Sequence, residues 1–154
     1  MSAADLHLLA RIAVGFALSF VLGFERELRG AAAGDRTFAL VGTGAAAVAA
    51  VAGRSSPQAL GGIVTGVGFI GAGLVFRSPI GRPHGITSAA AVWAVAAIGM
   101  VAGLGHPVLA VCLTAVVLVD LELRHVPLLS RLDSRRYAAM VEPDEPRGSE
   151  DAGQ

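Results

Sequence analysis

Long apolar segments, separated by short polar ones, run along most of this chain. A helix that crosses a membrane needs about 17–25 mainly apolar residues. Five segments approach or reach that length: Leu6–Gly23, Phe38–Gly53, Leu60–Phe76, Ile86–Leu104 and Pro107–Leu123. The alternative is a buried helical core in a soluble protein, but segments with hardly any polar face disfavour it. The pattern predicts an all-α polytopic membrane protein, with a compact bundle of five transmembrane helices in residues 1–123.

The composition supports a bilayer environment. Of 154 residues, 54% are hydrophobic and 16% are charged, whereas a soluble domain carries about 25% charged residues. The formal net charge is zero, so no basic field favours binding to nucleic acid. We therefore expect lipid, and no nucleic acid, to surround the spans.

Arginines predict the direction of the chain through the membrane. By the positive-inside rule, loops rich in arginine stay in the cytoplasm. One side of a five-span protein would hold ten arginines, in 24–37, 77–85 and the tail, and the other would hold Arg54 and Arg11. This asymmetry predicts an outside N-terminus and a cytoplasmic tail, residues 124–154. Within that tail we expect an amphipathic helix over 128–141 and disorder over 142–154.

The stretch GVGFIGAG, Gly66 to Gly73, matches the dinucleotide-binding pattern G-x-G-x-x-G. That pattern acts between a strand and a helix, with an acid about 20 residues further on. No Asp or Glu lies between Asp35 and Asp120, so we expect no nucleotide cofactor. Small residues four apart instead allow two helices to pack closely. The predicted packing residues are Gly15, Ser19, Gly23, Gly62, Gly66, Gly68, Gly71 and Gly73, with Gly42, Ala46 and Ala50 on the same spacing in the second span.

Polar residues gather at the predicted cytoplasmic face. A charge near the bilayer is costly unless it is paired or hydrated, so we expect a ring of mutually compensating side chains, with Asp120 and Arg26 as a cross-helix pair. The predicted ring consists of Glu25, Arg26, Glu27, Arg36, Thr37 and Asp120. The alternative is that these residues only flank the spans, with their charged groups reaching out to water, and have no functional role. Arg11, inside the first span, either snorkels outward or points into the bundle.

Nothing in the sequence predicts catalysis or a metal site. The four histidines are scattered without the spacing of metal ligands, and no nucleophile, base and orienting group converge. We expect a protein that is not an enzyme and that has no cofactor and no metal.

Four segments together resemble the MgtC/SapB family of bacterial inner-membrane proteins over roughly residues 8–121. They are LARIAVGFALSFVLGFERELRG, GDRTFALVGTGAA, GVGFIGAGLVFR and GITSAAAVWAVAAIGMVAG. The resemblance implies a five-span protein linked to growth under magnesium limitation and, in pathogens, to survival inside macrophages. It also implies restraint of the F-type ATP synthase by contact within the membrane, rather than magnesium transport.

The resemblance also implies roles for residues at matching positions. The implied functional polar residues are Glu25, Arg26, Glu27, Arg36 and Thr37. The implied packing motif consists of Gly66, Gly68, Gly71 and Gly73. Asp35 departs from the apolar or small residue expected before Arg36. A second departure is the short stretch after the last span, where some members carry a folded cytoplasmic domain.

Two functions remain open from the sequence. One is a membrane regulator that binds another integral membrane protein, the ATP synthase being the implied partner, with self-association left open. The other is a small transporter or channel for Mg²⁺ or another ion. Mg²⁺ needs oxygen ligands, and the middle parts of the predicted spans contain no acid, which favours the regulator.

Overall fold

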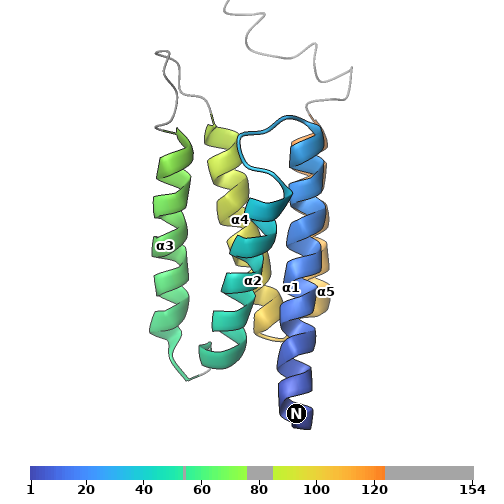
Figure 1. Ribbon diagram of the computed structural model, residues 1–154, viewed down its shortest axis with the longest axis vertical. Helices are drawn as coiled ribbons and strands as arrows, with labels where there is room; N and C mark the ends of the chain where they lie inside the picture. Colours follow the sequence, from blue (N-terminus) through green and yellow to red (C-terminus); the bar gives the residue numbers. More distant parts are fainter. Residues whose placement is uncertain (54, 76–84, 124–154) are drawn as a thin grey trace, which may run out of the picture. The chain divides into compact units, whose positions relative to one another are not determined.

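The computed structural model describes residues 1–53, 55–75 and 85–123, and these contain helices and no strand. The helices are α1 (Ala3–Leu28), α2 (Asp35–Ala52), α3 (Pro57–Val75), α4 (Ile86–Gly103) and α5 (Pro107–Leu123) (Figure 1). The predicted all-α class is confirmed. Residues 1–119 form one compact unit and residues 120–154 are assigned to a second, so the first unit is described by itself.

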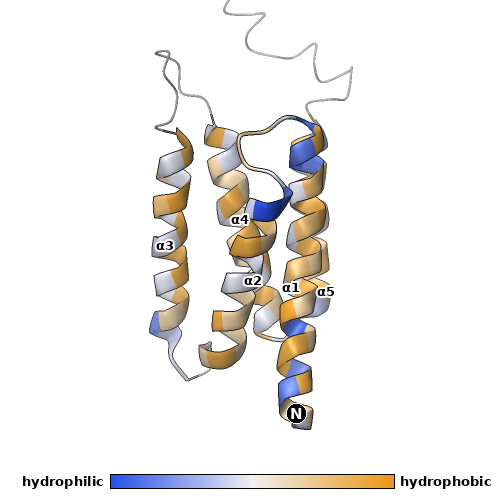
Figure 2. Ribbon diagram, in the orientation of Figure 1, coloured by the Kyte–Doolittle hydropathy of each residue, from blue (hydrophilic) through white to orange (hydrophobic). Residues whose placement is uncertain are grey.

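Four of the helices, α1 to α4, are long and apolar enough to cross a membrane. Their apolar residues cover most of the helix surfaces, and hydrophilic residues concentrate near the helix ends (Figure 2). The helix α5 has 17 residues and is not among these four in the described part of the chain. Four predicted spans are thus confirmed as candidates, while the fifth span and the direction through the membrane stay predictions. The predicted helix over 128–141 and the disorder over 142–154 lie outside the described residues.

The helices α1, α2 and α4 form the core of the bundle. Each of the three packs against the other two, whereas α3 packs on α4 and, less extensively, on α2. Figure 1 shows α3 at the edge of this arrangement. The largest fully buried side chains all come from the three core helices, and they are Phe38, Leu22, Ile98, Val92, Val95 and Ser19.

Glycines bring the backbones of the three core helices into contact. A Cβ atom on Gly42 of α2 would overlap the Ser19 hydroxyl of α1, and a Cβ on Gly99 of α4 would overlap the Gly42 carbonyl oxygen. One turn further along α4, a Cβ on Gly103 would overlap the carbonyl oxygen of Ala46. Removing the side chain lets the backbones approach and gain dispersion contacts that lipid does not supply.

The small-residue stripe predicted on the first span lies against α2. A Cβ on Gly15 would lie 2.6 Å from the Cβ of Ala46, and a Cβ on Gly23 would lie 2.7 Å from the Cα of Asp35. Ser19 lies between them and is fully buried. Its hydroxyl has no hydrogen-bond partner among the described residues. The oxygen instead occupies the space that a Gly42 side chain would fill.

The predicted packing glycines of α3 behave differently. A Cβ on Gly71 would lie 3.5 Å from Ala89 of α4, an ordinary contact. At Gly62, Gly66, Gly68 and Gly73, a Cβ would meet nothing within 4 Å. No described helix of this chain packs closely on those four residues, and whether another chain does stays a prediction. The whole GVGFIGAG stretch lies inside α3, away from any strand-to-helix turn in the described chain.

The close contact of α2 and α4 predicts different effects for two matched substitutions. Gly99→Ala forces the new methyl group into the Gly42 backbone, so we expect the free energy of unfolding to fall by about 1–3 kcal/mol. Gly44→Ala adds the same methyl group on α2 where nothing lies within 4 Å. Because alanine is the better helix former by about 1 kcal/mol, this control keeps or raises stability. Unfolding of the purified protein in detergent measures both, and equal losses would contradict the packing described here.

Candidate functional site

The polar cluster sits where α1 ends and α2 begins. The sequence predicted a loop over 24–37, but α1 continues to Leu28, and only residues 29–34 connect the two helices. This correction has a local cause. Glutamate and arginine are good helix formers, and Glu25 pairs with Arg29 one turn later, with 3.4 Å between Arg29 Nε and Glu25 Oε1. The charged residues Glu25, Arg26 and Glu27 are therefore placed by a helix.

Arg26 is a buried cation at this end of the core. It continues the inward face of α1 that carries Gly15, Ser19 and Leu22, and it is 8% exposed. Its Nε and Nη2 atoms both donate to the carboxylate of Glu25. This two-bond geometry is the strongest arrangement of arginine with a carboxylate, and it neutralises the charge that α1 buries.

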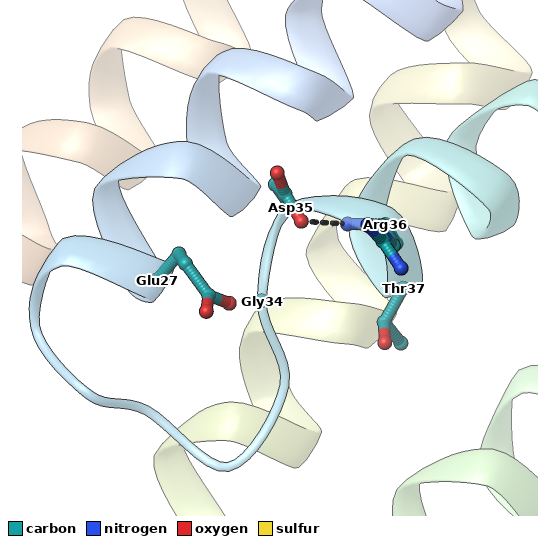
Figure 3. Close-up of a pocket in the computed structure, with 5 residues that line it drawn as sticks. All are labelled: Glu27, Gly34, Asp35, Arg36 and Thr37. Atoms are coloured by element: carbon teal, nitrogen blue, oxygen red, sulfur yellow. Dashed lines mark hydrogen bonds between the residues drawn. The ribbon is translucent and has the colours of Figure 1, made fainter.

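Glu27 faces the start of α2 (Figure 3). Its carboxylate lies so close to Gly34 that a Cβ at that position would overlap the Glu27 Oε2 atom. Gly34 is the N-cap residue of α2, and it provides no side chain to cap the helix. The positive end of the α2 dipole therefore has the Glu27 carboxylate beside it, a favourable arrangement of charge.

The first residues of α2 complete a small open pocket. It has a volume of about 380 Å³ and is lined by Glu27, Gly34, Asp35, Arg36 and Thr37. Within it, Asp35 Oδ1 accepts the backbone N–H of Arg36 at 2.6 Å, and the Arg36 side chain is exposed. The negative charge of Asp35, unexpected from the family resemblance, stands in the first turn of α2, where the helix dipole favours it.

Five of the six residues of the predicted polar ring are brought together by the α1–α2 connection. These are Glu25, Arg26, Glu27, Arg36 and Thr37. Asp120 is exposed and belongs to the second unit, so its predicted pairing with Arg26 stays a prediction. Of the other arginines predicted to lie on the cytoplasmic side, Arg77, Arg82 and those of the tail fall outside the described residues.

The cluster offers charge and hydrogen bonding. Among the described residues, no group of three or more His, Cys, Asp or Glu side chains is placed to hold a metal ion. Its carboxylates lie beside arginines or a helix N-terminus. The side chain of Arg36 is exposed at the rim of the pocket.

Sequence reasoning missed the contribution of α4 to the packing contacts. Gly99 and Gly103 are four residues apart in GMVAG, so the spacing that selected the other glycines would have found them.

Comparison with known proteins decides the family. Residues 12–127 match the MgtC family. This chain belongs to the MgtC family. It is thus a bacterial membrane protein of that family, and its candidate spans fit the assignment. No solved structure matches it significantly.

The relatives are longer than this chain. It is 40% identical over 104 residues to Protein MgtC of Brucella abortus, covering 64% of this chain and 43% of that protein. It is 38% identical over 117 residues to Protein MgtC of Salmonella typhimurium, covering 73% and 48%. The Putative magnesium transporter YhiD of Escherichia coli K12 is 38% identical over 145 residues, covering 84% and 63%. This MgtC-family chain therefore spans only about half the length of these relatives.

The buried pair predicts a large cost for removing the Glu25 charge. The side chains of Arg26 and Glu25 are 10% and 15% exposed, so Glu25→Gln leaves a buried cation without its counter-charge. We expect a loss of about 3 kcal/mol in the free energy of unfolding. Arg29→Gln is the control, because the Arg29 side chain is 39% exposed and such pairs contribute below about 1 kcal/mol. Unfolding in detergent compares the two, and a similar small loss for both would show that Arg26 is not held by Glu25.

Proposed function

We propose that this protein is a regulator in the bacterial plasma membrane that acts through helix contacts with another integral membrane protein. The observation that carries this proposal is the outward face of α3. At Gly61, Gly62, Gly66, Gly68 and Gly73, a side chain would meet nothing within 4 Å. These glycines expose backbone on the outward side of α3, beside Phe69, which is 84% exposed, and the described helices of this chain leave that side uncovered.

The α3 face differs from the outward face of α1. There, Phe16, Phe20 and Phe24 form a stacked ladder with ring centroids 5.9 and 6.3 Å apart. Such large side chains are suited to contact with lipid tails. A glycine in a helix costs about 1 kcal/mol relative to alanine, and close approach of a second helix recovers that cost. The α3 face therefore suits a protein neighbour better than it suits lipid.

The family resemblance implies a partner for the protein, without assigning it to a face. It implies the F-type ATP synthase, and self-association is the second way in which the face could be covered. We also propose that α5 is a fifth span, which puts the N-terminus outside and the polar cluster at the cytoplasmic surface, because that direction places most arginines inside. In this account the protein is not an enzyme.

Transport of Mg²⁺ is the second candidate function, and the name of the Escherichia coli relative, a putative magnesium transporter, favours it. Mg²⁺ is bound by carboxylates, other oxygens and retained water. Among the described residues, no acid lies in the chain between Asp35 and Asp120, and the buried Ser19 hydroxyl is enclosed by packed helices. The structure therefore gives the regulator more support than the transporter.

ATP-driven proton pumping in inverted membrane vesicles tests the regulator directly. Vesicles from magnesium-starved cells that lack this protein should pump more strongly than vesicles that contain it. Equal pumping would contradict a role at the ATP synthase, and Mg²⁺ flux into liposomes that hold the purified protein would then decide for or against the transporter.

The α3 face predicts a substitution that separates contact from folding. Gly66→Leu places a bulky side chain on the proposed contact, which costs about 1–3 kcal/mol in a close-packed interface, or about 5- to 150-fold in affinity. We expect vesicles with this variant to pump like vesicles without the protein. Gly44→Leu is the matched control, since Gly44 of α2 is also exposed with nothing within 4 Å. The same loss of effect in both variants would remove the α3 face from the account.

The polar cluster predicts a second loss of effect. Arg36 is exposed at the start of α2, so Arg36→Ala should leave membrane insertion and helix content unchanged. We expect it to abolish the effect on proton pumping, because it removes the exposed cation of the pocket. Wild-type activity in this variant would show that the cluster serves the fold alone.

A further inference from the structure

Arg11 lies at the opposite end of the bundle from the polar cluster, and its side chain is half-buried. A Cβ on Gly105 would lie 3.0 Å from the Arg11 Cζ atom and 3.2 Å from Nε and Nη2. The guanidinium is therefore seated against the turn that joins α4 to α5. The helix α1 begins at Ala3, about 12 Å before Arg11 at the usual helical rise, and its first turns extend past the ends of the other helices (Figure 1).

The turn is built to receive this cation. Gly105 has a φ of +93°, a conformation that glycine adopts freely, and its missing side chain leaves room for the guanidinium. The negative end of α4 points here, and the residue that would donate to the Gly103 carbonyl is Pro107, which has no N–H. The helix end is equivalent to about half a negative charge, so it attracts Arg11 without balancing its whole charge.

The described chain supplies no anion to Arg11. Neither of the ion pairs found among the described residues includes it. Asp5 is the one acid of α1 before Glu25. Its carboxylate accepts the backbone N–H of Ser2 at 2.8 Å as part of the helix cap. An arginine at the edge of a bilayer is stabilised by hydration or by a counter-charge, and a counter-charge for Arg11 would come from outside the described part of the chain.

We propose that Arg11, seated against the Gly105 turn, binds a phosphate group at the membrane surface. Phosphate accepts two parallel bonds from a guanidinium, and phospholipid headgroups supply this group at the level where helix ends meet water. His7 precedes Arg11 by one turn and His106 directly follows Gly105, and each imidazole carries an N–H donor. Because both leaflets contain phosphate, the site does not depend on the direction of the chain or on the regulatory function.

Retention of lipid by the purified full-length protein tests this site. Native mass spectrometry would count bound phosphatidylglycerol on the wild type and on Arg11→Gln, with Arg29→Gln at the other end as the control. A second arm would replace the lipid by inorganic phosphate in lipid-free detergent. We expect Arg11→Gln to reduce lipid retention about tenfold, as the loss of a charge-assisted two-bond contact, and Arg29→Gln to retain lipid like the wild type.

The two arms distinguish the source of the phosphate group. A loss seen only with phosphatidylglycerol identifies a headgroup site, and an Arg11-dependent loss seen with inorganic phosphate identifies a site for the free anion. Equal binding by the wild type and Arg11→Gln in both arms overturns the proposal. If circular dichroism shows that Arg11→Gln does not fold, Arg11→Lys decides. It keeps the charge without the planar fork, so weaker retention supports the site and wild-type retention contradicts it.

Discussion

The close approach of three helices at Gly42 is the contact on which the rest of the structure depends. On one side, the Ser19 hydroxyl of α1 fills the space of a Gly42 side chain, and on the other, Gly99 of α4 lies against the Gly42 carbonyl. In a bilayer, helices gain little from the hydrophobic effect when they associate, so dispersion between close backbones must hold them. The helix α4, which packs against α1, α2 and α3, is the most buried of the four candidate spans.

This core determines where the functional surfaces lie. Because Gly23 lets the start of α2 lie against α1, Glu27 reaches the N-terminus of α2 and the polar cluster forms over a connection of only six residues, 29–34. At the other end, Gly105 lets Arg11 lie against the α4–α5 turn. The peripheral α3 is left with its glycines uncovered, so this MgtC-family protein combines a tightly packed core with an open small-residue face.

The sequence predicts the helices and the small-residue spacing along them. Which face of a helix turns toward its neighbours depends on how that helix is oriented about its own axis, and this is harder to predict. Small residues four apart predicted the roles of Gly15, Ser19 and Gly23, because that spacing puts them on one face whatever the neighbour. The same spacing in α3 could not tell whether its face turns inward or outward, since α3 is apolar all round. Arg11 was left between two orientations for the same reason. The extent of α1 past Gly23 was missed because charge was interpreted as the end of a span.

Photo-crosslinking from position 69 in native membranes tests the central claim most directly, that the α3 face meets another protein. A photoreactive phenylalanine analogue in place of Phe69, which is 84% exposed beside the glycines of α3, should crosslink to a second integral membrane protein, which mass spectrometry would identify, in membranes of magnesium-starved cells. The same residue at position 44, which is also exposed, should crosslink to lipid. Crosslinking to lipid alone from both positions would contradict the account.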